Sequence, residues 1–96
     1  MSVIRVIRYT TSPDAADENA RLIRDVFDEL TQSRPDGFTY TAYRLDDGVS
    51  FLHVAEISGA DNPLTSSPAF AAFQAGIAER CIDGPHPAEA TVVGSY

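Results

Sequence analysis

The sequence predicts an α+β protein, a ferredoxin-like βαββαβ sandwich in which two helices cover one face of a four-stranded antiparallel sheet. Three observations predict this class. Short β-rich runs alternate with helical periodicities in that order, both helix starts contain a Ser-Pro pair, and an Asp-Gly pair separates the two middle strands. The 96 residues are one domain, 1–96, because a second core would leave each half too small to bury enough apolar surface.

The first strand and the first helix occupy the N-terminal third. Val3 to Tyr9 is rich in β-branched residues, and its apolar side chains fall on both parities, which predicts a strand covered on both faces. Ser12-Pro13 predicts the helix start, with Ser12 as its cap. The helix ends at the breaker cluster 33–37. Its apolar stripe consists of Ala16, Ala20, Ile23, Phe27 and Leu30.

The middle of the chain predicts a β-hairpin. Two β-rich runs, Phe38 to Leu45 and Val49 to Ile57, flank Asp46-Asp47-Gly48, and we expect Asp47-Gly48 to form a two-residue turn. A three-residue turn would change the partners but not the alternation of faces. The two-residue register places three pairs on one face of the sheet: Tyr40 with Ala55, Ala42 with His53, and Arg44 with Phe51.

The C-terminal third predicts a loop, a helix and a last strand. The loop is 58–66, and Ser67-Pro68 opens a helix of about four turns. Asp83-Gly84-Pro85 ends this helix, and Ala90 to Tyr96 is predicted to be the last strand. The apolar stripe of the helix consists of Ala69, Phe70, Phe73, Ile77 and Cys81.

Composition excludes several classes of partner. The net charge of −7 would repel phosphate backbones and anionic lipid head groups, so we expect neither nucleic acid nor a membrane surface as a partner. The single Cys81 cannot form an intrachain disulfide, and arginines interrupt the N-terminal apolar stretch where a signal peptide would need an unbroken one. A cytoplasmic location is therefore expected.

The strands also predict self-association. A sandwich that is alone in solution leaves one sheet face wet, and its strands should then alternate between apolar and polar residues. The third strand instead has Phe51, Ala55 and Ile57 on one parity and Leu52 and Val54 on the other. We infer that a second copy of the chain covers the face without helices, and a homodimer is the simplest closed arrangement.

Several of these features together match a known family. The third strand FLHVAEI has a late Glu56, Asp61 lies in the following loop, and the pattern S-P-x-F-x-x-F places Ser67, Phe70 and Phe73 at the helix start. With the βαββαβ order, the chain resembles the dimeric α/β-barrel superfamily over almost its whole length. Within it, the chain is most similar to the antibiotic-biosynthesis-monooxygenase-like domains.

The resemblance implies a homodimer with face-to-face sheets and a small cleft between helices and sheet in each protomer. Some members of the family carry out cofactor-free oxygenation of polycyclic phenols, and others bind haem. The histidine common just before the helix start is absent here, its place falling near Leu64-Thr65, and the chain has no tryptophan. These departures argue against haem, and we expect no cofactor.

Two residues are the candidate catalytic groups. With the ordinary pKa of an imidazole, His53 could deprotonate an enol or phenol at neutral pH, and Tyr40, on the same face, could donate a hydrogen bond to a substrate oxygen. The alternatives are a hydrogen-bonded core or interface histidine and an aromatic packed at a dimer contact.

Four further residues are candidate ligand-binding groups: Phe51, Arg44, Phe70 and Phe73. Arg44 could recognise a carboxylate or an oxyanion, although ion pairing with the many acidic residues is the commoner role. The phenylalanines are equally typical of a core. The spacing of Cys81, Asp83 and His86 matches no zinc pattern, and no metal is predicted.

Two hypotheses of function follow. The first is a homodimer that binds an aromatic or polyketide-like small molecule and, if it is an enzyme, acts as a cofactor-independent monooxygenase with His53 as base and Tyr40 as hydrogen-bond donor. The alternative is a non-catalytic ligand-binding or subunit-interaction module. A cavity near His53 of ~300 Å³ or more would favour the first.

Overall fold

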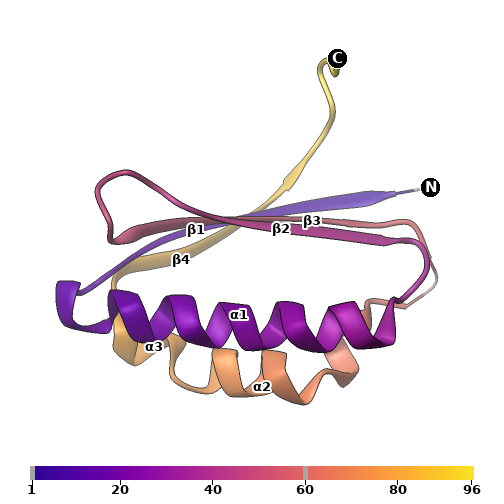
Figure 1. The fold of residues 1–96 in the computed structure, drawn as a ribbon. Coiled ribbons are helices and arrows are strands. Elements are labelled where there is room, and N and C mark those ends of the chain that lie inside the picture. The colour runs from indigo at the N-terminus through magenta and orange to yellow at the C-terminus, as the bar shows by residue number, and fades with distance from the viewer. Residues whose placement is uncertain (1, 60) are drawn as a thin grey trace.

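The computed structural model describes residues 2–59 and 61–96, so Ala60 of the predicted loop lies outside the described residues. The strands are β1 (Val3–Thr11), β2 (Phe38–Arg44), β3 (Ser50–Ile57) and β4 (Cys81–Ala90). The α-helices are α1 (Ala16–Ser33), α2 (Pro68–Ala75) and the short α3 (Ile77–Arg80), with 3₁₀ turns at Pro13–Ala15 and Pro63–Ser66. All the helices lie on one side of the sheet, which confirms the predicted sandwich (Figure 1).

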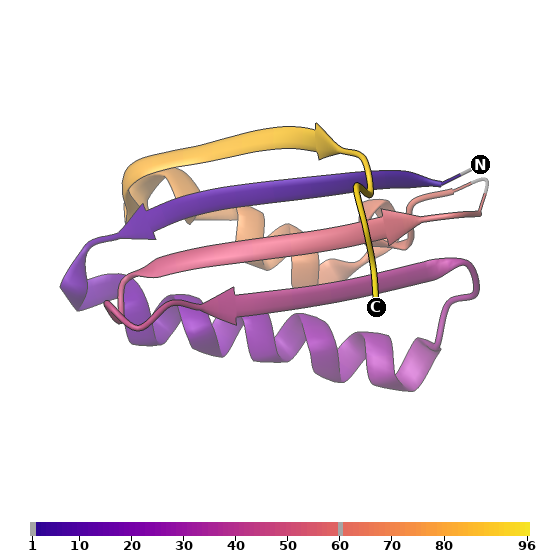
Figure 2. The same ribbon diagram turned by 90° about the horizontal axis from the view of Figure 1, so that it is seen from above.

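The sheet is antiparallel, with the strand order β2-β3-β1-β4 (Figure 2). The predicted hairpin register is confirmed, because Tyr40 faces Ala55, Ala42 faces His53 and Arg44 faces Phe51. The two-residue turn is wrong. Leu45 and Ser50 close a four-residue loop, 46–49, through a bond from the Leu45 amide to the Ser50 carbonyl of 2.9 Å.

The loop keeps the predicted register because it extends the tight turn by one residue on each side. The carboxylate of Asp47 holds it, since Asp47 Oδ1 accepts hydrogen bonds from the amides of Val49 and Ser50 at 3.0 and 2.8 Å. Gly48 supplies a positive φ of 79°. Local side-chain bonds of this kind compete with a tight turn and decide the loop length.

The start of the first helix also differs in detail from the prediction. Pro13–Ala15 is a 3₁₀ turn, and the Ser12 side chain makes no capping bond. The Ser12 amide donates instead to the carbonyl of Arg80 at 2.9 Å, which ties the start of the helix to the end of α3. The helix ends at Ser33, as the breaker cluster predicts, and Arg34 follows in the left-handed region with a φ of 45°.

The C-terminal third corrects the prediction most. The second helix stops at Ala75, Gly76 interrupts it, and Cys81 already belongs to β4. Asp83-Gly84-Pro85 therefore lies inside the last strand, where the pairing with β1 is irregular, rather than ending a helix. β4 is an edge strand, and edge strands tolerate proline because one row of their amides has no partner to lose.

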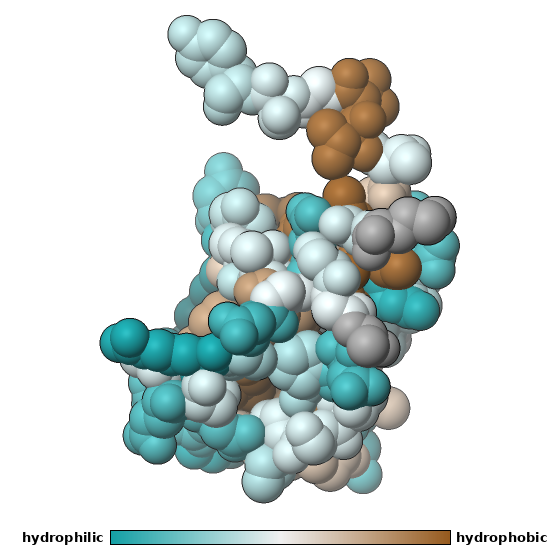
Figure 3. Space-filling view, turned by 90° about the vertical axis from the view of Figure 1, so that its right-hand side faces the viewer, coloured by the Kyte–Doolittle hydropathy of each residue, from teal (hydrophilic) through white to brown (hydrophobic). Residues whose placement is uncertain are grey.

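The predicted last strand, Ala90 to Tyr96, is wrong apart from its first residue. Residues 91–96 leave the sheet on the side opposite the helices, and Figure 3 shows this segment projecting from the body of the molecule. Val92 and Val93 are exposed there.

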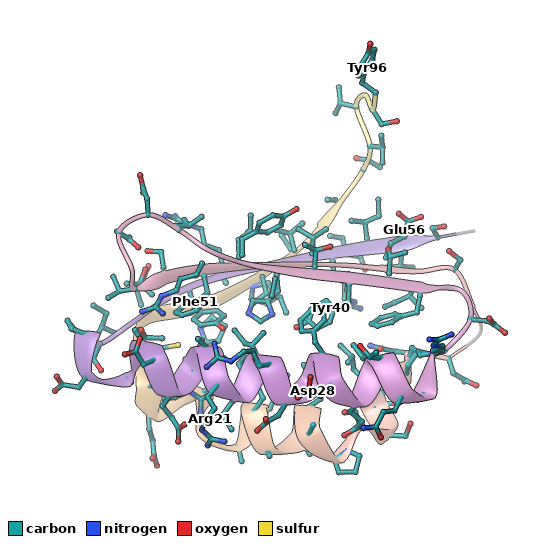
Figure 4. The ribbon with its side chains drawn as sticks, viewed as in Figure 1. Arg21, Asp28, Tyr40, Phe51, Glu56 and Tyr96 are labelled. Carbon is teal, nitrogen blue, oxygen red and sulfur yellow. The ribbon has the colours of Figure 1, made fainter. Side chains whose placement is uncertain are left out.

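The core lies between the sheet and the helices. Tyr9, Val26, Phe51 and Phe73 are almost fully buried in it. Figure 4 shows Tyr40 and Phe51 on the helix side of the sheet and Glu56 on the other side, which we call the open face. The face predicted to hold Tyr40, Phe51 and His53 is therefore the face that the helices cover.

Candidate functional site

A cavity of about 300 Å³ lies between the sheet and the segment that contains α2 and α3. Most of its wall is apolar, formed by Ile7, Ala55, Leu64, Phe70, Phe73 and Ile77. Polar groups interrupt this wall at Tyr9, Tyr40 and His53, and elsewhere at Arg5, Asn62 and Gln74. A cavity of this size, mostly apolar with a few polar groups, is typical of a small-molecule site.

His53 lies at the centre of the polar part of the wall. Its side chain projects from β3, and only 4% of its surface is exposed. The Tyr9 hydroxyl lies 2.8 Å from His53 Nε2, and the Tyr40 hydroxyl lies 2.5 Å from His53 Nδ1. Both ring nitrogens are therefore engaged, each by a tyrosine from a neighbouring strand.

The hydrogen-bonded line continues beyond Tyr9 into the helices. Asn19, on α1 and fully buried, donates from Nδ2 to the Tyr9 hydroxyl at 2.8 Å. Arg80, at the end of α3, donates from Nε to Asn19 Oδ1 at 2.9 Å and from Nη2 to the Phe73 carbonyl at 2.6 Å. The five residues Arg80, Asn19, Tyr9, His53 and Tyr40 form one chain of bonds, which we call the relay.

Two features hold the relay in place. The Phe73 ring lies under the Arg80 guanidinium, 5.2 Å from its centroid, and the missing side chain of Gly76 leaves room for it, since a Cβ there would lie 2.9 Å from Arg80 Nη1. At the other end, the ring of Tyr40 stacks on Phe27 of α1, with centroids 4.9 Å apart. Aromatic packing and hydrogen bonds thus fix both ends.

Burial shifts the pKa values of His53, Tyr9 and Tyr40 in the directions that keep these three side chains uncharged. Desolvation lowers the pKa of His53 to about 4, so its imidazole is neutral at neutral pH. Desolvation also raises the pKa of the Tyr9 and Tyr40 phenols, so both are protonated. The hydrogen bond from Asn19 and the charge of Arg80 act in the opposite direction on Tyr9 but are smaller effects.

The structure brings together four of the six predicted site residues. Tyr40, His53, Phe70 and Phe73 all line the cavity. The other two, Phe51 and Arg44, do not line this cavity.

Phe51 and Arg44 belong instead to the core and its margin. Phe51 stacks on Tyr9 with centroids 5.4 Å apart, and the Arg44 guanidinium lies 5.7 Å from the Phe51 ring. Arg44 donates to the Gly48 carbonyl at 2.9 Å and to Asp17 at 3.1 Å. Its charge is thus already paired with a carboxylate of α1.

The sequence reasoning missed Tyr9 and Asn19, and it left Arg80 open between a solvent-exposed position and a site. Tyr9 has the same parity as Ile7 on β1, but its position opposite Phe51 depends on long-range strand pairing. Asn19 lies three residues after Ala16, within the apolar stripe of the first helix, so a polar residue on an apolar helix face was the available signal. Arg80 is the last residue of α3, and the sequence does not reveal the break at Gly76 that separates this short helix from α2.

Other candidate sites are not supported in the described residues. Asp83 and His86 are hydrogen-bonded at 3.0 Å, but within residues 2–59 and 61–96 no group of three or more His, Cys, Asp or Glu side chains is arranged to hold a metal. None of the helices in the described part of the chain is long and apolar enough to cross a membrane.

Comparison with known proteins supports the fold. No family model and no curated protein sequence matches the chain. Solved structures do match. Rv0793 from Mycobacterium tuberculosis superposes with a TM-score of 0.76 and 19% identity, covering 99% of this chain and 98% of that one.

Two other structures carry names that describe an activity. SnoaB, a cofactor-independent oxygenase from Streptomyces nogalater, gives a TM-score of 0.69 at 18% identity, over 98% of this chain and 95% of that one. A protein named antibiotic biosynthesis monooxygenase gives 0.70 at 14% identity, over 98% and 100%. The chain therefore shares its fold with these proteins, which include a cofactor-independent oxygenase and an antibiotic biosynthesis monooxygenase, and this is the fold that its sequence resemblance predicted.

Proposed function

We propose that this protein binds an aromatic or polyketide-like small molecule in the cavity beside His53. The observation that carries the proposal is the wall itself, which combines the rings of Phe70 and Phe73 with the hydroxyl of Tyr40. Flat rings would gain apolar contact from the two phenylalanines, whose centroids are 6.0 Å apart, and the tyrosine would fix one polar atom of the ligand.

A cavity-filling variant tests this proposal. Ala55→Leu adds three carbons inside the cavity, and we expect it to weaken binding of anthrone-like and quinol compounds at least tenfold in calorimetric titrations, because the added carbons take the ligand's place. Ala42→Leu is the matched control, since Ala42 is on the same sheet face but does not line this cavity. Equal affinities for both variants would place the ligand elsewhere.

We further propose that the bound molecule is oxygenated without a cofactor. The overall reaction that balances is conversion of a CH₂ group flanked by aromatic rings and O₂ into C=O and H₂O. SnoaB, which shares the fold, is named as a cofactor-independent oxygenase. In this chain Tyr40 would touch the ligand as a hydrogen-bond donor, stabilising negative charge on an oxygen atom as the CH₂ group loses its proton to solvent water.

The role of His53 follows from its contacts. The base that the sequence suggested needs a free ring nitrogen, and both nitrogens are bonded to tyrosines. With a pKa of about 4, the imidazole is also a weak proton acceptor. We therefore propose that His53 acts through Tyr40 rather than directly on the ligand.

Oxygen uptake distinguishes this activity from simple binding. With anthrone-like substrates we expect consumption of one O₂ per molecule converted, at a rate that is at least tenfold lower in Tyr40→Phe when the substrate is saturating. Ala42→Leu serves as the control. Binding without oxygen uptake would instead identify a non-catalytic ligand-binding module, which is favoured by one observation: the described lining of the cavity contains no carboxylate.

We also propose that two copies pair through the open face. Strand register places Ile4, Val6, Leu52 and Val54 on that face, and each is only partly buried. Apolar side chains gain about 25 cal/mol per Å² when such a surface is covered. Sedimentation should show a dimer at micromolar concentration, and a stable monomer would refute this pairing.

A further inference from the structure

The hydrogen bonds of the relay all donate in one direction, and the bond from Arg80 to Asn19 sets that direction. Arginine side chains only donate hydrogen bonds. The atom of Asn19 that faces Arg80 Nε at 2.9 Å is therefore the carbonyl oxygen, and the amide nitrogen must face Tyr9. Arg80 thus fixes the orientation of an amide that could otherwise point either way.

The order of the remaining protons follows step by step. The Tyr9 oxygen accepts from Asn19, and its own proton has one partner among the described residues, His53 Nε2 at 2.8 Å. If Nε2 carried a proton instead, the Tyr9 hydroxyl proton would be left without an acceptor in a side chain that is 1% exposed. Leaving a buried donor unpaired disfavours that arrangement by roughly tenfold or more. Tyr9 therefore donates to Nε2.

A neutral imidazole that accepts at Nε2 carries its proton on Nδ1. Nδ1 lies 2.5 Å from the Tyr40 oxygen and donates to it. The Tyr40 proton then points away from His53, and in the described residues no other hydrogen bond to this hydroxyl is present. Because Tyr40 lines the cavity, the proton is available to a ligand.

We infer that Arg80 and Asn19, although neither acts on the ligand directly, set the proton order of the relay so that Tyr40 meets the ligand as a hydrogen-bond donor, and that the site selects molecules with an acceptor oxygen, such as a ketone or a phenolate, at Tyr40. Arg80, Asn19 and Tyr9 are positioning residues in this scheme. The part that concerns ligands rests on the proposed cavity function, whereas the proton order does not.

The histidine tautomer tests the proton order without any ligand. Two-bond ¹⁵N–¹H correlation spectra at neutral pH distinguish protonation at Nδ1 from protonation at Nε2, and His86→Gln assigns the signals, because the chain has two histidines. We expect His53 to be protonated at Nδ1. Protonation at Nε2 in the wild-type protein would overturn the inference, whether or not any variant folds.

Asn19→Asp should invert the relay. An aspartate of the same shape would still accept from Arg80 through one oxygen. Its other oxygen would accept a hydrogen bond from the Tyr9 hydroxyl, whereas the amide nitrogen of Asn19 donates one to it. Tyr9 would then accept from His53 Nε2, and Tyr40 would donate to Nδ1. The matched control is Asn62→Asp, another cavity residue, whose side chain accepts from the Leu64 amide at 3.0 Å and has no hydrogen bond to the relay among the described residues.

The spectra of these two variants have opposite expected outcomes. We expect protonation at Nε2 in Asn19→Asp and at Nδ1 in Asn62→Asp. A purely structural role of Asn19 predicts no change of tautomer in a folded variant. A folded Asn19→Asp that keeps its proton on Nδ1 would therefore overturn the inference.

A pair of probe molecules tests the selectivity. 1-Tetralone has a ketone oxygen, and tetralin has the same ring skeleton without it. Wild-type protein should bind 1-tetralone roughly tenfold more tightly than tetralin, as expected for one added hydrogen bond, and Tyr40→Phe should abolish this preference. Equal affinities in the wild-type protein would refute the donor role of Tyr40. If neither probe nor the anthrone-like compounds bind, the cavity function fails while the tautomer result still decides the proton order.

Discussion

Acidification should destabilise the folded protein through His53 specifically. Burial holds the pKa of His53 at about 4, against 6.5 for an ordinary histidine. Between these values the unfolded chain binds a proton that the folded chain excludes, so the free energy of unfolding decreases as the pH falls. At 1.36 kcal/mol per pKa unit, the loss from about pH 7.5 to about pH 4 is about 3 kcal/mol.

A variant without an ionisable group at position 53 isolates the contribution of His53 to the pH dependence of unfolding. His53→Gln removes the ionisable group, so urea unfolding at fixed protein concentration should give a free energy that depends less on pH than in the wild-type protein, by about 3 kcal/mol over the same range. Carboxylates such as Asp47, whose pKa is lowered by hydrogen bonds from Ser50 and Val49, add acid sensitivity to both proteins equally. Parallel pH profiles for the two proteins would show that His53 is not buried in its neutral form.

Four further perturbations probe the turns on either side of β2, the C-terminal third and the dimer. Gly48→Ala, at a φ of 79° with open space around it, should cost about 1 kcal/mol in urea unfolding, and Gly37→Ala, at 67°, should cost more, since its Cβ would lie 2.9 Å from the Gly59 amide nitrogen. Equal costs would argue against that close approach. Gly76→Ala should shift the His53 ring signals in ¹⁵N spectra by displacing Arg80, whose Nη1 would be 2.9 Å from the new Cβ, and an unchanged spectrum would uncouple Arg80 from the relay. Truncation after residue 90 should weaken the proposed dimer in sedimentation experiments, because it removes exposed Val92 and Val93.

Local sequence signals were sufficient for the N-terminal two thirds of the fold. An Asp-Gly pair between two runs of alternating residues indicates both the hairpin and its register. The register in turn determines which side chains lie on the same face of the sheet. That is why Tyr40 and His53 were correctly placed together. The loop length was missed only because Asp47 forms bonds that its neighbours' identities do not dictate.

The C-terminal third was misread because its structure is decided by distant partners. Residues 81–90 contain two prolines and a glycine and have weak strand propensity, yet they pair with β1 along most of its length. Prolines and a glycine are tolerated in this strand because it lies at the edge of the sheet, and no local sequence pattern reveals which segment will form the edge strand. The relay was invisible for the same reason, since it joins β1, α1, β3, β2 and α3 through contacts between distant parts of the chain.

The relay is also hard to explain by stability alone. Each of its hydrogen bonds replaces a bond to water and contributes only about 1 kcal/mol, while neutralising a buried histidine and fully burying Asn19 oppose that gain. Apolar side chains of similar size could fill the positions of Tyr9 and His53 without the cost of burying polar groups. A directional line of bonds that begins at a charged, partly buried Arg80 and ends at a hydroxyl in an aromatic cavity is better accounted for by what it presents to that cavity. The polar groups of the core and the aromatic lining of the cavity thus both support the proposal that Tyr40 holds one oxygen atom of a mostly apolar molecule.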